Sequence, residues 1–256
     1  MRPFGETLFR LEGKRALVTG SSRGIGAAIA QGLASFGAEV VVHGSTEHST
    51  RDTCADIQAA GGNTHGVGAD LSVANAGKLL ISAAEQLGGP IDILIVNASA
   101  QVNGQIETIS DENFALHLAV NLRSTIDMLQ ACLPGMAERG WGRVVSIGSI
   151  NQFRPKPVVT MYAATKAAQH NLMQSLARQY APHGVLLNTL APGLIDTDRN
   201  ADRRDSDPAG WEVYVRDLNW MGRAGHVNEM VGAAVFLSSN ACSFMTGESI
   251  VMTGGY

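Results

Sequence analysis

The sequence predicts a three-layer, doubly wound α/β fold, in which helices cover both faces of a seven-stranded parallel sheet. Short apolar, β-branched runs alternate along the chain with longer amphipathic stretches, and a glycine-rich turn follows the first run. Strands are expected at residues 15–19, 39–43, 64–68, 91–97, 143–147, 185–191 and 249–252. Helices are expected at 25–36, 72–87, 111–139, 162–180 and 227–237, and the third stretch is long enough for two helices.

One domain is expected to span the whole chain, residues 1–256, because a chain of this length can bury one large core. No Pro/Ser-rich linker and no repeat divides the sequence. The least regular segment is 196–225, which is rich in Asp and Arg and too polar for the core. We expect this segment to be a mobile cover over a site.

Composition and charge exclude several classes of protein. The 45% hydrophobic and 16% charged residues are ordinary for a globular protein, and the net charge of −4 without a basic run argues against a nucleic-acid partner. The first ten residues lack the apolar run of a signal peptide, and no stretch is long enough for a membrane span. Cys54, Cys132 and Cys242 lack any metal-ligand spacing, so we expect buried thiols, no metal site and a cytoplasmic location.

A glycine-rich turn between the first predicted strand and the first predicted helix indicates nucleotide binding. Its glycines let the backbone approach a pyrophosphate, while the N-terminus of the helix directs N–H groups and a positive dipole end toward the phosphates. The spacing is Gly-x-x-x-Gly-x-Gly, which differs from the Gly-x-Gly-x-x-Gly fingerprint, and a tight turn alone explains it about equally well. The expected contacts are Gly20, Ser22, Arg23, Gly24, Ile25 and Gly26.

Other residues follow the predicted strands at positions that suit a dinucleotide lying across the strand ends. Asp70 and Leu71 are expected at the adenine, Asn97 and Ala98 at the adjoining ribose, and 192–197 at the nicotinamide carboxamide. The residues of this last group are Pro192, Gly193, Ile195 and Thr197. Each has a purely structural alternative, since an Asp after a strand often caps a helix and Pro-Gly often ends a strand.

The end of the second predicted strand bears on the choice of dinucleotide. An Asp or Glu there would bind a ribose 2′-hydroxyl, but the sequence at this corner is His43-Gly44-Ser45-Thr46. Arg23, helped by the hydroxyls of Ser45 and Thr46, suits a 2′-phosphate instead. NADP is therefore expected to be preferred over NAD, with a solvated surface charge as the alternative role of Arg23.

Three residues indicate proton-transfer chemistry. Tyr162 and Lys166 are four residues apart and hence share a helix face, and Ser149 directly follows the strand at 143–147. The carboxyl ends of parallel strands are where ligands bind in such sheets. Taken singly, each of these residues is more often structural, so their joint placement carries the interpretation.

Together these motifs resemble the short-chain dehydrogenase/reductase family, in order and along the whole chain. The resemblance includes the glycine turn, Asn97-Ala98, Asn121, Ser149, Tyr162 with Lys166, and Pro192-Gly193. It implies a Rossmann fold, a nicotinamide cofactor, a homo-oligomer (a dimer or a tetramer) and a catalytic tetrad of Asn121, Ser149, Tyr162 and Lys166. One departure is Ser99, where the Asn-Ala-Gly motif of the family ends in Gly; a side chain there is expected to crowd the ribose or shift the loop.

The expected reaction is hydride transfer between the nicotinamide and a carbonyl or alcohol carbon, with Tyr162 as the general acid or base. Lowering the phenol pKa from ~10 to about 7 takes about 4 kcal/mol. One cation at ~5 Å supplies roughly 3 kcal/mol at an effective dielectric of ~20, so Lys166 and the positively charged nicotinamide are needed together. Ser149 is expected to hydrogen-bond the reacting oxygen, Lys166 to bind the ribose hydroxyls, and Asn121 to anchor a water that relays protons.

The substrate is expected to be a small sugar, polyol or sugar acid, because polar residues cluster near the tetrad in the sequence. Asn103 and Gln105 belong to this set, and the candidate substrate contacts are Ser149, Asn151, Gln152 and Arg154. A 3-oxoacyl thioester (acyl-carrier-protein) reductase is the alternative, favoured by apolar residues of the cover: Trp211, Tyr214, Trp220 and Met221. A non-catalytic, cofactor-sensing protein is the alternative of another class. The helices expected at 111–139 and 162–180 are candidates for pairing between subunits.

Overall fold

The computed structural model describes residues 7–255, in which seven parallel strands form one sheet in the order β3-β2-β1-β4-β5-β6-β7. The bounds are β1 (Arg15–Val18), β2 (Glu39–Gly44), β3 (Thr64–Gly68), β4 (Ile93–Val96), β5 (Gly142–Ile147), β6 (Val185–Pro192) and β7 (Ser249–Met252). Every predicted strand is confirmed, with bounds that differ by two residues or fewer. The first six residues, where no signal peptide was expected, lie outside the described part of the chain.

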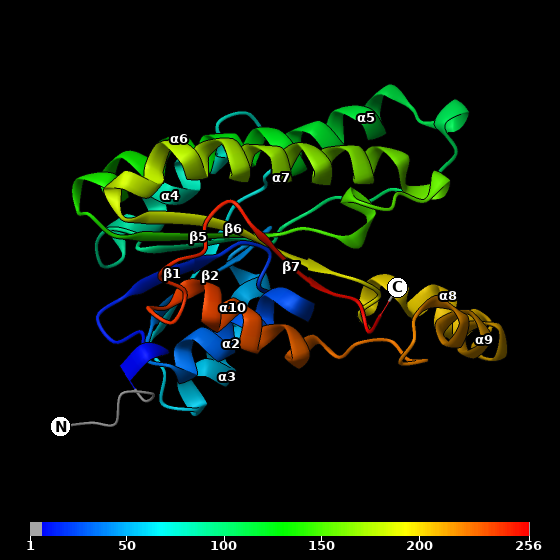
Figure 1. Ribbon diagram of the computed structural model, residues 1–256, viewed down its shortest axis with the longest axis horizontal. Helices are drawn as coiled ribbons and strands as arrows, with labels where there is room; N and C mark the ends of the chain where they lie inside the picture. Colours follow the sequence, from blue (N-terminus) through cyan, green and yellow to red (C-terminus); the bar gives the residue numbers. More distant parts are fainter. Residues whose placement is uncertain (1–6, 256) are drawn as a thin grey trace.

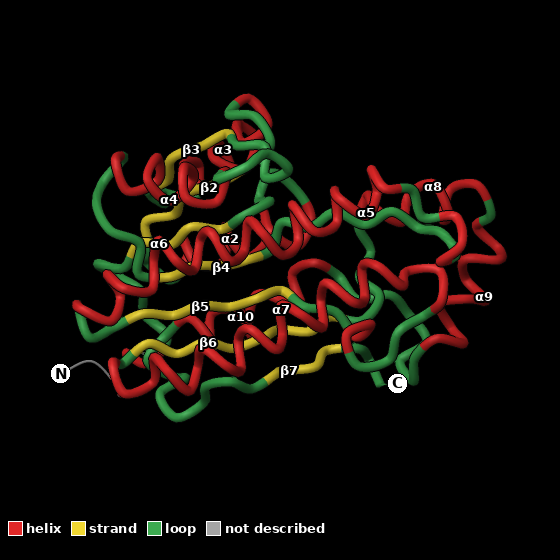
Figure 2. The backbone as a smooth tube through the Cα atoms, turned by 90° about the horizontal axis from the view of Figure 1, so that it is seen from above, coloured by secondary structure: helices red, strands yellow, loops and turns green. Residues whose placement is uncertain are grey.

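Helices cover both faces of the sheet and make the three layers visible in Figure 1 and Figure 2. One face carries α2 (Gly24–Ser35), α3 (Arg51–Ala59) and α10 (Val231–Ser238). The other carries α4 (Ala76–Gln86), α5 (Asp111–His117), α6 (Ser124–Glu138) and α7 (Thr160–Tyr180). The doubly wound fold expected from the sequence is thereby confirmed. No helix within residues 7–255 is long and apolar enough to cross a membrane.

The core is divided by the sheet into two apolar clusters, and the alternation of side chains along each strand assigns residues to them. In β4, Ile93 and Ile95 pack in the cluster beneath α2 and α10, whereas Leu94 packs in the cluster beneath α4 and α6. Both faces of the strand are buried, which explains why it reads as a continuous apolar run.

Helix α3 and the starts of α4 and α10 differ from the sequence-based expectations, whereas the stretch 111–139 is divided between two helices, as its length allowed. Helix α3 was not predicted, because only Thr53 and Ile57 of its nine residues are buried and the apolar periodicity is correspondingly faint. The stretch 111–139 is interrupted by a π-helical segment at Leu118–Arg123, which separates α5 from α6. The α-helical part of 227–237 begins only at Val231, after a 3₁₀ turn.

The cover segment is more regular than expected, since it contains α8 (Ala201–Ser206) and α9 (Pro208–Leu218). Helix α9 begins where the Asp207 carboxylate accepts a hydrogen bond from the Gly210 N–H (2.9 Å), with Pro208 in the first turn. It is anchored by Trp211 and Val215, which are four residues apart and both buried. Both helices lie beyond the carboxyl end of the sheet (Figure 1), where they border the site.

Candidate active site

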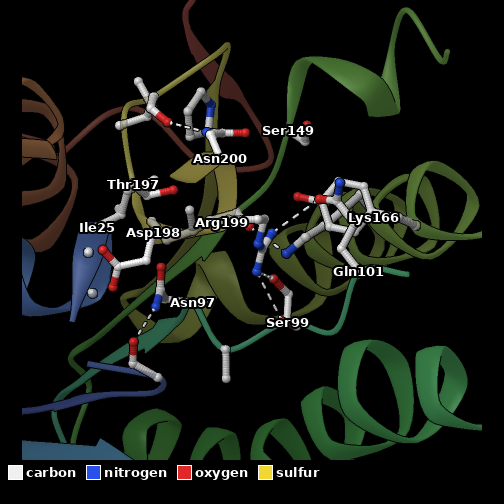
Figure 3. Close-up of a pocket in the computed structure, with 18 of the residues that line it drawn as sticks. Ile25, Asn97, Ser99, Gln101, Ser149, Lys166, Thr197, Asp198, Arg199 and Asn200 are labelled. Atoms are coloured by element: carbon white, nitrogen blue, oxygen red, sulfur yellow. Dashed lines mark hydrogen bonds between the residues drawn. The ribbon is translucent and has the colours of Figure 1, made fainter. Parts of the chain in front are cut away.

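A cavity of about 770 Å³ opens at the carboxyl ends of the central strands, beneath the cover. Its walls come from the glycine turn before α2, from the segments that follow β2 to β6, from α7 and from the cover. The strand order reverses between β1 and β4, which is where doubly wound sheets bind dinucleotides. Figure 3 shows part of the wall, with Asn97 and Lys166 on opposite sides of Arg199.

The glycine turn has the geometry that a pyrophosphate requires. Gly20 and Gly24 have φ values of +61° and +60°, in the left-handed region where a side chain would be strained. A Cβ on Gly26 would lie 2.3 Å from the Gly20 carbonyl oxygen and 2.5 Å from Asn97 Nδ2. Asn97 braces the turn, since its Nδ2 donates to the carbonyl oxygens of Thr19 (2.8 Å) and Gly20 (2.9 Å). The turn therefore fits a phosphate-bearing cofactor at the N-terminus of α2, which has no acidic residue in its first turn.

His43, in β2, is a supporting residue that the sequence analysis did not assign. Its Nδ1 accepts a hydrogen bond from the Gly20 N–H (3.0 Å), and its Nε2 lies 3.0 Å from the Ala69 carbonyl oxygen. These partners require a proton on Nε2 and none on Nδ1. Burial lowers the pKa of His43, so the ring stays neutral and ties the glycine turn to the ends of two neighbouring strands. In the sequence, the only signal for this supporting role is a histidine near the end of a predicted strand.

Most of the residues expected at the adenine end line the cavity, among them Ser45, Asp70, Leu71 and Ala98. Asp70 also accepts hydrogen bonds from the Ser72 hydroxyl (2.7 Å) and N–H (2.9 Å), which lower its pKa. Arg23 lines the cavity with a largely exposed side chain, 3.5 Å from the Asp198 carboxylate. Thr46 does not line the cavity, and its hydroxyl accepts a hydrogen bond from the Ser49 N–H (3.3 Å) within its own turn.

Ser149, Tyr162 and Lys166 line one part of the cavity and are buried. Helix α7 begins at Thr160, so Tyr162 and Lys166 face the cavity from its first two turns. Lys166 Nζ donates to the Ile147 carbonyl oxygen (2.7 Å) and lies 5.8 Å from the centre of the Tyr162 ring. Ser149 Oγ accepts from the backbone N–H (3.2 Å) and Nδ2 (3.3 Å) of Asn151, which fixes its position.

Burial dominates the electrostatics of this group. It raises the pKa of Tyr162, against the opposing effects of the Arg199 charge and of hydrogen bonds with Ser149 and Arg199. Burial, with a smaller contribution from Arg199, lowers the pKa of Lys166 to about 7. Both shifts favour the neutral forms. The protein alone thus does not make the phenol acidic.

Asn121 lies in the π-helical segment, fully buried and outside the residues that line the cavity. Its Oδ1 accepts from the Ala100 N–H (2.7 Å), and its Nδ2 donates to the Ala100 carbonyl (2.9 Å) and to Thr165 Oγ1 (3.0 Å). Its backbone carbonyl accepts from Gln169 Nε2 and from Thr125 Oγ1. These polar atoms are engaged by protein groups, so Asn121 braces the loop after β4 against α7, and the water relay expected of it stays a prediction.

Of the residues expected at the substrate, Asn103 and Asn151 line the cavity, whereas Gln105, Gln152 and Arg154 do not. Gln152 instead accepts a hydrogen bond from the Ser149 N–H through its Oε1 (3.1 Å). At the nicotinamide end, Pro192, Gly193, Ile195 and Thr197 line the cavity as expected.

Three basic residues that were not singled out in the sequence also line the cavity: Lys156, Arg199 and Arg203. Arg199 reaches across from the cover to the loop after β4, where it donates to the backbone oxygen and to the hydroxyl of Ser99 (both 3.2 Å) (Figure 3). In the sequence, the signals for this contact are the Arg-rich composition of the cover and the serine at position 99. The reach of its side chain follows only from the structure.

A seven-stranded parallel sheet, a glycine-rich turn at its switch point and a buried Tyr–Lys pair with a serine are the features of an NAD(P)-dependent oxidoreductase. The chain belongs to the short chain dehydrogenase family, whose model matches residues 14–208. Among solved structures, a 3-oxoacyl (acyl-carrier-protein) reductase from Agrobacterium tumefaciens with NADP bound is 64% identical, with a TM-score of 0.96 and coverage of 98% of this chain and 97% of that chain.

Other relatives carry names from sugar-acid metabolism. The gluconate 5-dehydrogenase of Gluconobacter oxydans is 37% identical over 252 residues, which are 97% of this chain and 96% of that protein. The structure of a gluconate 5-dehydrogenase from Burkholderia cenocepacia in complex with NADP and tartrate is 32% identical, with a TM-score of 0.91 and coverage of 98% and 97%. The chain is thus similar to enzymes named for two different substrate classes.

Proposed function

We propose that this oxidoreductase transfers hydride between a nicotinamide and a carbonyl or secondary alcohol of a small polar sugar, polyol or sugar acid. The observation that carries the substrate class is the polar wall around Ser149. Asn103 and Asn151 line the cavity there. The hydroxyls of a polyhydroxylated substrate would pair with such polar groups, and an alkyl chain would leave them unsatisfied.

In this proposal Ser149 hydrogen-bonds the reacting oxygen, and Tyr162 gives that oxygen a proton in reduction or removes one in oxidation. Lys166 stabilises the phenolate. It binds the nicotinamide ribose through those N–H groups of its ammonium that do not donate to the Ile147 carbonyl oxygen. Asn121 is a positioning residue, which holds the loop after β4 and, through Thr165, the helix that carries Tyr162 and Lys166. When bound, the nicotinamide supplies or accepts the hydride.

The cofactor is proposed to be NADP in preference to NAD. Gly20, Ser22, Gly24, Ile25 and Gly26 would hold the pyrophosphate, and Arg23 with Ser45 would bind the 2′-phosphate. The β2 end presents Gly44 and Ser45 to the cavity in place of a carboxylate. Solved relatives named as NADP complexes support this preference.

Reduction of a 3-oxoacyl thioester is the second candidate, favoured by the name of the 64% identical structure. The cavity wall gives it partial support, since Val158, Val159 and Leu218 are apolar members of the lining. Of the apolar cover residues expected for this function, only Tyr214 lines the cavity. Trp211 is buried, whereas Trp220 and Met221 are exposed.

A substrate panel separates the two candidates. Sugars, polyols, sugar acids and 3-oxoacyl thioesters are each incubated with NAD(H) and with NADP(H), and the nicotinamide absorbance is followed in both directions. We expect turnover of polyhydroxylated compounds, with a higher kcat/KM for the NADP(H) couple. Turnover of thioesters alone would replace the proposed substrate class by the second candidate.

The chain is further proposed to act as a single catalytic domain in a homo-oligomer, a dimer or a tetramer. Helices α6 and α7 lie side by side on the outer side of one helical layer in both views (Figures 1 and 2), where a second copy has access to them. Light scattering of the purified protein after size exclusion gives its mass, and a monomer would contradict this proposal.

A further inference from the structure

The substrate side of the cavity carries an excess of positive charge. Arg199 and Arg203 come from the cover and Lys156 from the loop that precedes α7, and all three line the cavity with Ser149 and Tyr162. Within residues 7–255 none of the three forms an ion pair with a carboxylate, whereas the neighbouring Arg204 pairs with Asp196 and Asp205.

Arg199 is the cation nearest to the reacting groups, and its partners are all neutral. It donates to the backbone oxygen and hydroxyl of Ser99 and to Gln101 Oε1, each at 3.2 Å (Figure 3). Its Cζ lies 6.0 Å from the centre of the Tyr162 ring. Because these partners are neutral, a carboxylate would form stronger, charge-assisted hydrogen bonds with the same guanidinium.

Lys156 and Arg203 form a second part of the same positive surface. Lys156 Nζ donates to the Tyr214 hydroxyl (3.0 Å), and Arg203 Cζ lies 3.6 Å from the centre of the Tyr214 ring. Tyr214 therefore holds two cations close together. The proton of its own hydroxyl is left to donate to a third group, and an anion is the group that two adjacent cations favour.

The charge of Arg199 also acts on the reaction centre. It opposes protonation of Lys166 and lowers the pKa of Tyr162. Arg199, Arg203 and Lys156 repel one another on the substrate side of the cavity, and a negatively charged group bound among them relieves this repulsion. Asp198, which also lines the cavity, pairs with Arg23 instead. A neutral sugar or polyol supplies no such charge.

We propose that the substrate is an anion whose carboxylate binds Arg199 bidentately, while Lys156 and Arg203 attract it into the cavity. This inference rests on the proposed function and narrows it, since it selects sugar acids over neutral sugars and polyols. In this arrangement Arg199 sets substrate specificity, and Ser99 and Gln101 hold its guanidinium until the carboxylate replaces them.

The test compares aldonates, gluconate among them, with the matched aldonamides, in which a neutral amide replaces the carboxylate at the same size. For each pair, kcat/KM is measured with NADP⁺ for the wild type, Arg199→Met and the control Arg204→Met. We expect the wild type to prefer aldonates and Arg199→Met to reduce this preference by about 10- to 100-fold, the weight of a charge-assisted hydrogen bond or pair. Arg204→Met should retain the preference, because Arg204 does not line the cavity.

A second measurement, binding of gluconate to the NADPH-loaded enzyme by calorimetry, does not depend on turnover. Arg199→Met should weaken this binding. The double variant Lys156→Met/Arg203→Met should reduce the dependence of gluconate affinity on salt concentration. Equal use of aldonates and aldonamides, or equal gluconate affinity of the wild type and Arg199→Met, would overturn the inference and leave the proposed function intact. If neither sugar acids nor polyols are bound or oxidised while 3-oxoacyl thioesters are reduced, the proposed function fails together with the inference.

Discussion

Single residues of the site divide into those whose role lies in a local motif and those whose role depends on distant contacts. The placement of Tyr162, Lys166 and Ser149 at one end of the sheet could be predicted, because a four-residue helical spacing and a strand end bring them together. His43 and Arg199 could not, since one acts through a hydrogen bond to Gly20 and the other through a reach of about a hundred residues in sequence to Ser99. Thr46, which was expected at the cofactor, does not line the cavity, and its hydroxyl accepts a hydrogen bond within its own turn.

Arg23 is the residue through which we expect NADP to be distinguished from NAD. Arg23→Ala should weaken NADPH binding by about 10-fold, because a charge-assisted hydrogen bond to the 2′-phosphate is lost, and should change NADH binding little. Fluorescence titration with both reduced cofactors measures this difference. Arg51→Ala, which removes an exposed arginine that does not line the cavity, is the matched control. Equal losses of affinity for NADPH and NADH would show that Arg23 does not bind the 2′-phosphate.

Elements with strong apolar periodicity were predictable, and those held by few buried side chains were not. Strand β4 buries all four of its residues, and its pattern predicted it directly. Helix α3 buries two residues of nine, and α9 buries two of eleven, so capping signals such as Asp207 with Pro208 mark α9 better than its hydrophobicity does. The π-helical segment that carries Asn121 has no sequence signal that we can identify.

The strand–turn–helix element around Gly26 should not tolerate a side chain at that position. In Gly26→Ala the new Cβ would lie 2.3 Å from the Gly20 carbonyl oxygen, so the turn must shift. We expect a loss of about 1–3 kcal/mol in the free energy of unfolding, as for other overpacked sites, together with weaker NADPH binding.

Denaturant unfolding and NADPH titration of Gly26→Ala measure these effects. Gly232→Ala in α10 is the control, since a Cβ there has no neighbour within 4 Å. Wild-type stability and NADPH affinity in Gly26→Ala would show that the close approach of the turn to Gly20 is not required.

At the scale of the molecule, the seven-stranded sheet and its two helical layers could be predicted because parallel sheets need buried strands and covering helices. The end of the sheet at which the cavity opens also followed, since ligands bind at the carboxyl ends of parallel strands. The strand order, with its switch point between β1 and β4, came from the structure. The shape of the substrate side did not follow. It depends on how the cover folds back over the loop after β4, through contacts such as that of Arg199 with Ser99.

The central claim is that the phenol of Tyr162 exchanges a proton with the reacting oxygen of the substrate. It is tested most directly by the steady-state rate of Tyr162→Phe with the best substrate of the panel, at saturating NADP(H), beside an NADPH titration of the same variant. We predict a fall in kcat of about 100- to 10,000-fold, the usual contribution of general acid–base catalysis, while NADPH still binds. A variant that binds NADPH and turns over within a few-fold of the wild type would contradict the account.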